Sequence, residues 1–580
     1  MEEKTMKKIF AYSFAAVFAV FAVSCQSENL DPQTVTDEQN QPVQLITETI
    51  TATVDEGNTK ATVATSDGTF NWTGGTDKIA VHTTSGYVNS GAASATGNSA
   101  SFSVTYSGSR DAFAVYPYTL VYDEANDEYY SNSVSDYGQN EHSLIVNLPA
   151  TYALSAVSGE NTPCPMIADN TGSGWEFKQL CGLLRLTVSD IPSGTSYLKL
   201  DFNGRKVSGA FSVASPVTAG ISTIASVAGT KGTDDFIKIT GITTETSVTV
   251  NIPLPTGTAY SDLIVSAWNS SDVPLKAQVT PFSYTASRAK GKKLTSALSL
   301  GVFSIVSGKY AVIAPGNLQY QASTSTWRFA EHQYDYVGDG SNGNVYVGET
   351  KSNNASVSSD YTGWIDLFGW GTSGSAPSDQ TARAPYYTTQ NNSDYVSNIT
   401  TDGESWGENS EWDWGHNAIS NGGNTADTWR TLTKDEWVYL INVDNSGSYR
   451  QVTVGSDKKA PYGHASVNGV NGLVLLPDGW DGSVHSGFTY GKSSWSNVYT
   501  ESSTPKWSEM ESAGCVFLPA AGYRLGTGVY SVGDGGGYWS STASNADYAY
   551  GLNFFSSNVN PAFSNYRCYG YSVRLVQNLN

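Results

Sequence analysis

The chain has 580 residues, of which 32 are basic and 53 acidic, so its formal net charge is −21. This charge argues against a nucleic-acid-binding protein, which needs a basic surface to contact phosphates, and against electrostatic docking on anionic lipid. Aromatic residues make up 12% of the chain and charged residues only 15%, so most of it is expected to fold. The 57 glycines favour short strands joined by turns over an all-helical fold.

Residues 1–24 have the pattern of a secretory signal peptide. A Lys-Lys pair precedes an apolar segment that is too short to span a membrane, and small residues lead to Cys25. A cysteine in this place resembles the lipobox of bacterial lipoproteins, in which it becomes the lipidated N-terminus. The resemblance implies an outer membrane lipoprotein at the cell surface, anchored through Cys25; ordinary secretion is the alternative. Residues 25–44 are polar and acidic, as in a flexible tether, and resemble the surface-export signals of Bacteroidetes lipoproteins.

Four cysteines remain after the signal peptide. An exported protein meets oxidising conditions, which permit disulfides, and pairing within each region would join Cys164 to Cys181 and Cys515 to Cys568. Buried free thiols are the alternative. The sequence contains no CxxC pair of the kind that binds zinc, and its six histidines are scattered, so we predict no metal site and no cofactor.

Residues 45–300 show the alternation of polar and apolar residues that is typical of strands. Examples are residues 45–54, 183–188, 247–252 and 263–268, with turn residues between such runs. Several short strands separated by turns indicate β-sandwiches. We therefore expect a mainly β protein, with one sandwich over 45–182 and a second over 183–300.

Three motifs in this part carry a family resemblance. They are TKATVATSDGTFNWTGGTDKIAVHT at 59–83, AFAVYPY at 112–118 and FKQLCGLLRLTV at 177–188. Together and in this order they resemble the fimbrillin-like proteins of Bacteroidetes, which are precursors of pilus subunits. The resemblance implies tandem fimbrillin-like β-sandwiches and association with other pilus subunits by donor-strand exchange, in which a strand of one subunit completes the sheet of the next.

In that family a surface protease removes the N-terminal strand, usually after an arginine. Between Cys25 and Arg110 the only basic residues are Lys60 and Lys78. Lys60 is therefore the candidate site of proteolytic maturation. An uncut subunit that stays anchored to the cell is the alternative.

Residues 301–580 differ in character from the rest of the chain, and a basic segment at 286–300 marks the predicted boundary. Twelve of the 15 tryptophans lie between Trp327 and Trp539. One helix is predicted, in which Thr433 caps the N-terminus with Glu436 as its partner. Its apolar face consists of Trp437, Leu440 and Ile441.

The motifs YWSST at 538–542 and GYSVRLV at 570–576 carry a second resemblance. They resemble C-type-lectin-like domains of the formylglycine-generating-enzyme-like branch. This implies an irregular α+β domain over 301–580, in which most tryptophans belong to the core. The enzymes of that branch use paired cysteines close in sequence, and the cysteines here are isolated.

We therefore predict no catalytic residues and no enzyme. Signatures of nucleophilic serines and of phosphate-binding loops are absent from the sequence. Two acid pairs are close in sequence, Asp335 with Asp339 and Glu411 with Asp413, and nothing further recommends them. A surface enzyme that processes glycans is the least favoured of the functional hypotheses.

The segment 538–574 has the composition of a recognition surface. Its 37 residues include six Tyr, seven Ser, five Asn and two Gly, a mixture that dominates antibody paratopes because tyrosine gives rigid, amphipathic contact area. Period-2 alternation places Tyr550, Leu552 and Phe554 on one face, towards a core. The candidate ligand-binding residues on the opposite face and the adjoining loop are Asn545, Asp547, Tyr548, Asn553, Ser556, Asn558, Asn560, Phe563, Asn565, Tyr566, Cys568, Tyr569 and Tyr571.

The same segment resembles the variable region of proteins diversified by retroelements, whose scaffold is also a C-type-lectin-like domain. The resemblance implies a hypervariable surface; an ordinary Tyr/Asn-rich loop is the alternative. The leading functional hypothesis is a surface adhesin at or near a pilus tip that binds a host or bacterial protein or glycan. A structural pilin without a specific ligand is the second hypothesis.

Overall fold

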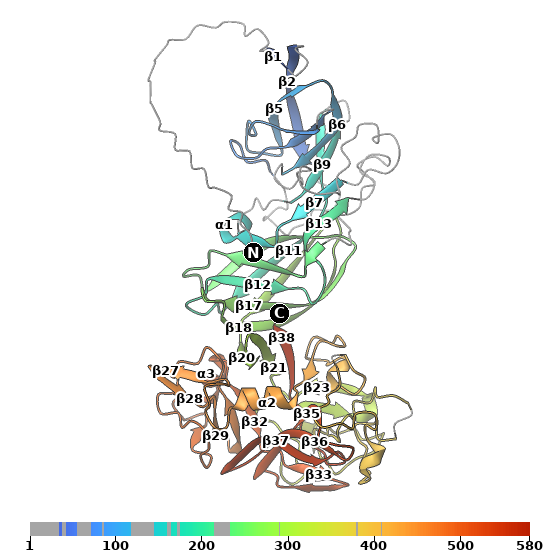
Figure 1. The fold of residues 1–580 in the computed structure, drawn as a ribbon, viewed down its shortest axis with the longest axis vertical. Helices are drawn as coiled ribbons and strands as arrows, with labels where there is room; N and C mark the ends of the chain where they lie inside the picture. Colours follow the sequence, from blue (N-terminus) through green and yellow to red (C-terminus); the bar gives the residue numbers. More distant parts are fainter. Residues whose placement is uncertain are drawn as a thin grey trace, which may run out of the picture.

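The computed structural model describes residues 34–36, 42–54, 71–83, 86–117, 144–158, 164–170, 174–213, 232–288, 290–378, 381–407 and 409–579. The signal peptide, Cys25 and Lys60 lie outside the described residues. Within them the protein is mainly β, as predicted, and forms three bodies stacked along its long axis (Figure 1). None of the helices in these ranges is long and apolar enough to cross a membrane.

The first body is an eight-stranded sheet around one apolar core. Its strands are β1 (Thr34–Thr36), β2 (Pro42–Val54), β3 (Ala80–Thr83), β4 (Gly86–Asn89), β5 (Ser99–Ser107), β6 (Arg110–Tyr116), β9 (Met166–Asn170) and β10 (Trp175–Gln179), in the order β1-β2-β10-β9-β6-β3-β4 with β5 on β2. Trp72 lies in the core and contacts Phe102, Tyr116 and Phe177 edge-on, with ring centroids 5.0–5.2 Å apart. Buried and exposed residues alternate along β5, as expected for a strand with one face on a core.

The second body packs a three-stranded sheet against a larger one, which is the arrangement of a sandwich. Its elements are β7 (Leu144–Leu148), β8 (Thr151–Ala153), α1 (Leu154–Val157), β11 (Gly182–Ser189), β12 (Tyr197–Asp201), β13 (Ser208–Val213), β14 (Gly232–Asp234), β15 (Phe236–Thr240), β16 (Ser247–Leu254), β17 (Ala259–Trp268), β18 (Pro274–Thr285) and β19 (Gly291–Ala297). The segment from β7 to α1 packs here, although the sequence analysis assigns it to the first sandwich. Tyr152 and Val157 lie in the second core before the chain returns to β9.

A continuous sheet joins the second body to the C-terminal body. β20 (Leu300–Val306) pairs with β18 on one side and with β21 (Lys309–Ile313) on the other. The sheet continues through β38 (Leu575–Leu579) to β26 (Arg430–Thr431). Gly301 approaches the backbone of Gly514 so closely that a Cβ atom would overlap it. The predicted basic junction at 286–300 contains β19, which pairs with β11 over seven residues.

The C-terminal body consists of short strands, two helices and long loops. Its remaining elements are β22 (Leu318–Gln321), η4 (Ala322–Thr324), β23 (Thr326–Phe329), β24 (Tyr346–Val347), β25 (Thr350–Lys351), η5 (Asn392–Asp394), η6 (Trp414–His416), α2 (Lys434–Ile441), β27 (Val452–Val454), β28 (Asp457–Lys459), β29 (Tyr462–Val467), β30 (Val470–Leu475), β31 (Asn497–Tyr499), α3 (Trp507–Ser512), β32 (Val516–Pro519), β33 (Tyr523–Leu525), β34 (Gly528–Tyr530), β35 (Gly535–Ala543), β36 (Tyr548–Phe555) and β37 (Asn558–Tyr566). The predicted helix is confirmed as α2. Thr433 accepts a hydrogen bond from the Glu436 backbone, and the Glu436 side chain accepts one from the Thr433 backbone.

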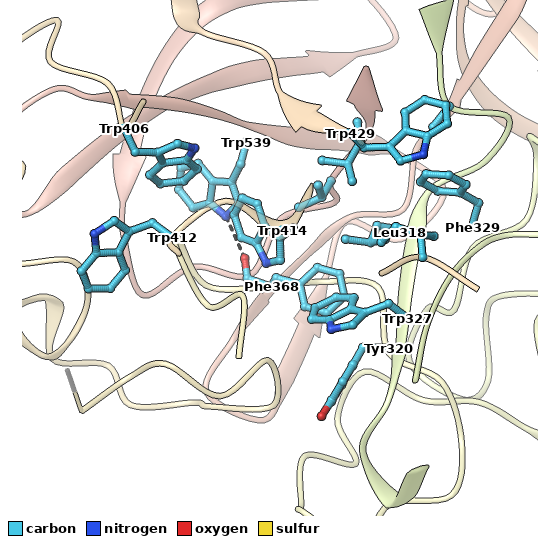
Figure 2. Close-up of a cluster of buried hydrophobic side chains, with 14 of the residues drawn as sticks. Leu318, Tyr320, Trp327, Phe329, Phe368, Trp406, Trp412, Trp414, Trp429 and Trp539 are labelled. Carbon is cyan, nitrogen blue, oxygen red and sulfur yellow. Dashed lines mark hydrogen bonds between the residues drawn. The ribbon is translucent and has the colours of Figure 1, made fainter. Parts of the chain in front are cut away.

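Tryptophan packing fills the core of the C-terminal body, as predicted. Eleven of the 12 tryptophans between Trp327 and Trp539 are buried. Figure 2 shows one cluster, in which the indole nitrogen of Trp539 donates to the Phe368 carbonyl at 2.7 Å. This hydrogen bond satisfies the polar atom of a ring that is otherwise surrounded by apolar side chains.

Candidate ligand-binding face

The predicted recognition segment forms most of a three-stranded antiparallel sheet, β35-β36-β37. The β33–β34 hairpin lies beside it and is held by bridges from Arg524 to Gly570 and from Gly522 to Gly536. Both units lie at the end of the molecule farthest from β1 and β2 (Figure 1). The face that they carry therefore lies far from the N-terminal body.

Tyr550, Leu552 and Phe554 alternate along β36 but differ in burial. The pairing with β37 shifts between Gly551 and Asn553, where one residue of β36 faces two of β37, so the extra residue lies in β37. Leu552 and Phe554 are buried as predicted, whereas Tyr550 is only half-buried. The Lys434 ammonium at the start of α2 lies 5.0 Å from the centre of the Tyr550 ring, and the Tyr550 hydroxyl donates to the Asp402 carboxylate at 2.9 Å.

The 13 candidate ligand-binding residues divide into three groups by exposure. The exposed group consists of Asn545, Asp547, Asn558, Asn560 and Tyr566. The partly exposed group consists of Tyr548, Asn553, Ser556, Phe563, Asn565 and Tyr569. Eleven of the 13 are thus accessible to a ligand, and the other two are buried.

The two buried candidates, Cys568 and Tyr571, require a correction. Tyr571 is 3% exposed because its ring packs on Trp539, with centroids 4.7 Å apart. Cys568 is 7% exposed and packs against Tyr395. Neither side chain can contact a ligand on the surface without displacing its neighbours.

Five tyrosines form a continuous file of ring contacts across this face. We call Tyr530, Tyr523, Tyr569, Tyr566 and Tyr548, in this order, the tyrosine row. Successive ring centroids are 5.4, 5.5, 6.0 and 4.3 Å apart. Tyr530 and Tyr566 are the most accessible, with exposed fractions of 49% and 39%.

The sequence analysis missed Tyr523 and Tyr530, which lie outside segment 538–574. They are direct cross-strand partners in the β33–β34 hairpin. Two tyrosines that flank a Gly-Thr-Gly turn are the signal that could have indicated them.

The exposed charges in the segments around the tyrosine row are mostly negative. A hydrogen bond between the Tyr548 and Tyr566 side chains raises the pKa of Tyr548 to about 12. Asp402, Glu404 and Asp547 are exposed in the segments that surround the row. Arg383 is exposed in the same segments, and Lys434 is partly exposed, with its ammonium 5.0 Å from the Tyr550 ring, whereas Arg524 and Arg567 are buried.

The buried arginines support the face from below. The Arg567 guanidinium donates to the carbonyls of Val396, Ile399 and Asn545, and its carbon lies 4.5 Å from the centre of the Trp370 ring. Burial lowers the pKa of Arg567 to about 10, so the side chain stays charged at neutral pH. It thereby fixes the turn that precedes Tyr548.

All four cysteines of the described residues are buried free thiols. The proposed Cys515–Cys568 bridge is not formed, because the two residues lie in separate apolar clusters. Cys164 and Cys181 are in contact, and the thiol hydrogen bond between them, together with burial, raises the pKa of Cys181 well above its usual range.

One of the four acids considered in the sequence analysis, Asp413, is held by hydrogen bonds within the protein. Asp413 is buried, and its two oxygens accept hydrogen bonds from Gly415, from the backbone and hydroxyl of Thr431, and from the Trp406 indole. It lies beside a cleft of about 510 Å³ in which Arg430 and Glu436 form an ion pair at 2.7 Å. Within the described part of the chain, no group of three or more His, Cys, Asp or Glu residues is placed to hold a metal ion.

A family described as a domain of unknown function (DUF8237) matches residues 492–576, a range that contains the whole tyrosine row. Similar solved structures include a "putative cell adhesion protein" from Bacteroides ovatus, at 13% identity and a TM-score of 0.28 over 43% of this chain and 91% of that one. A protein of the same description from Bacteroides uniformis shows 14% identity and a TM-score of 0.23, over 43% and 92%.

The tip fimbrial protein Mfa3 from Porphyromonas gingivalis is also similar, at 10% identity and a TM-score of 0.19, over 41% of this chain and 81% of that one. Similarity at this level carries no argument about the function of this chain. The comparison with curated proteins found no match.

Proposed function

We propose that the protein is a cell-surface adhesin, anchored through Cys25 and associated with a pilus, that binds a protein or glycan through the tyrosine row. The observation that carries the proposal is the position of the row. Five neighbouring tyrosines, two of them more than a third exposed, lie at the far end from the N-terminal body (Figure 1). Exposed aromatic clusters of this kind are typical of binding sites.

The pairing of β2 supports assembly with other pilus subunits by donor-strand exchange. β2 pairs with β5 along nine residues and with β10 along three, so it lies between two neighbours of the same sheet. Proteolysis at Lys60, followed by loss of the segment before it, would expose both of these edges to a strand from another subunit. β38, by contrast, is paired on both sides and is not available as a donor.

We expect the proposed hypervariability to affect the accessible candidate residues near the row. Asn545, Asp547 and Tyr548 occupy a surface turn, where substitution leaves the core unchanged. Deep sequencing of codons 538–574 in a population grown from one isolate tests this. We expect substitutions at these adenine-containing codons, with Trp539 and Leu552 unchanged. A uniform sequence would remove hypervariability from the proposal and leave an adhesin with a single ligand.

Binding itself is tested by adhesion of cells that display the full chain. We expect Tyr566→Ala to reduce adhesion to host cells or to partner bacteria. The matched control is Tyr346→Ala, which removes a tyrosine that is 56% exposed in β24, outside the row. Equal adhesion of the two variants and the unchanged protein would favour the structural pilin instead.

A further inference from the structure

The Tyr523 ring, within the tyrosine row, has little free face. Tyr523 lies between two other tyrosines. Tyr530 is its cross-strand partner in the hairpin, and Tyr569 lies on the other side of β33, next to the bridge from Arg524 to Gly570. The interplanar angles are 27° to Tyr530 and 4° to Tyr569, so both neighbours stack on the Tyr523 ring. The centroid spacings of 5.4 and 5.5 Å are close to the separation of adjacent strands, about 4.8 Å. The Tyr523 ring therefore presents its edge and hydroxyl group to solvent.

This geometry bears on the class of ligand. A sugar ring binds an aromatic side chain by lying flat on an open ring face, and in this row the faces of Tyr523 are covered by other tyrosines. A file of ring edges and hydroxyls instead offers apolar contact together with hydrogen bonds at low entropic cost, which suits the backbone and side chains of a protein surface.

The charges around the row indicate which charge a partner surface should carry. Asp402 is tied to β36 through the Tyr550 hydroxyl, and Asp547 directly precedes Tyr548. The guanidinium groups of Arg524 and Arg567 are engaged with backbone carbonyls beneath the surface. A basic partner is attracted to such a face, and an acidic one is repelled.

Resting on the proposed function, we infer that the ligand of the tyrosine row is a protein with a basic epitope rather than a glycan. The lysine and arginine side chains of the epitope pair with Asp402, Asp547 and Glu404 at the margin of the row. Its apolar atoms and backbone contact the ring edges and hydroxyls. Binding weakens with rising salt, because the ion pairs at this margin are exposed to solvent.

The test uses the full chain and two defined probes, a displayed library of random peptides and an array of defined oligosaccharides. We expect the selected peptides to be enriched in Lys and Arg relative to the library. Binding of the best peptide should fall by roughly tenfold in the double variant Asp402→Asn with Asp547→Asn, and further in Tyr523→Ala. Glu349→Gln and Tyr346→Ala, at exposed positions outside the row, serve as matched controls and should bind normally.

The outcomes separate the inference from the proposed function. Glycan binding that is lost in Tyr523→Ala would overturn the inference and leave the adhesin proposal intact. Peptides without basic enrichment, or binding unchanged by the two Asp→Asn substitutions, would also overturn it. No row-dependent binding of either probe would contradict both. The conservative Asp→Asn substitutions keep the test valid if Tyr523→Ala fails to fold.

Discussion

Arg567 provides the sharpest test of how the binding face is held. Its guanidinium is fully buried and donates to three backbone carbonyls, of Val396, Ile399 and Asn545. Substitution by methionine keeps much of the volume but leaves those three carbonyls without this donor. Hydrogen bonds from charged donors contribute about 1.5–3 kcal/mol each, and the desolvation of the arginine offsets part of that sum. We therefore expect Arg567→Met to lower the free energy of unfolding by about 3–5 kcal/mol.

The assay for Arg567→Met is urea unfolding of the full chain followed by tryptophan fluorescence. Twelve of the 15 tryptophans lie in the C-terminal body, so this signal reports mainly on that body. Arg383→Met is the matched control, because Arg383 is exposed, and we expect it to change stability by less than about 0.5 kcal/mol. A loss below about 1 kcal/mol for Arg567→Met would refute the reasoning, since it would mean that the three carbonyls find water or other donors at little cost.

Three further predictions follow from individual contacts. Thr433→Ala removes the N-terminal capping hydrogen bond of α2 and should destabilise the C-terminal body by about 1 kcal/mol in the same urea assay. Burial raises the pKa of Asp366 to about 6, above the value near 4 in an unfolded chain. The folded protein therefore holds this proton more tightly, so the contribution of Asp366 to stability should fall by about 2–3 kcal/mol as pH rises from about 4 to about 6 and then stay constant. The free energy of unfolding, measured against pH, should therefore decline over this range in the unchanged protein but not in Asp366→Asn. Parallel curves for the two proteins would contradict the prediction. Cys164, just before β9 of the first body, contacts Cys181, just before β11 of the second, so we expect the two thiols to oxidise in an extracellular setting. The bridge would stabilise the protein by about 3 kcal/mol. Non-reducing peptide mapping of the exported protein should find it, and two free thiols would exclude it.

The elements that the sequence predicts well are those whose signals are local. Helix α2 is an example, because Thr433 and Glu436 satisfy its first backbone donors within one turn. The mainly β class is another, because alternation along a strand such as β5 directly reflects which face lies on the core. The burial of the tryptophans follows in the same way from their size and apolar character.

The elements that the sequence predicts poorly depend on contacts between distant segments. Tyr550 alternates with Leu552 and Phe554 but is only half-buried, and an alternation pattern contains no signal for the point at which a strand leaves the core. Tyr571 is buried because Trp539 packs against it, and no feature near residue 571 in the sequence predicts that contact. The tyrosine row likewise exists only because the β33 hairpin pairs with the chain near Gly570.

The continuous sheet between the second and C-terminal bodies fixes the proposed binding face relative to the second body. If the two bodies were joined by a flexible linker, the tyrosine row would have no fixed direction relative to the second body. Here β20 pairs with β18 of the second body, and the close approach of Gly301 to Gly514 leaves no room for a side chain between them. β38 then links this sheet to β26, so that strands from both ends of the C-terminal body hold the junction. This construction suits the proposed adhesin, because a face held in a fixed direction on the second body can meet a partner without the entropic cost of ordering a hinge.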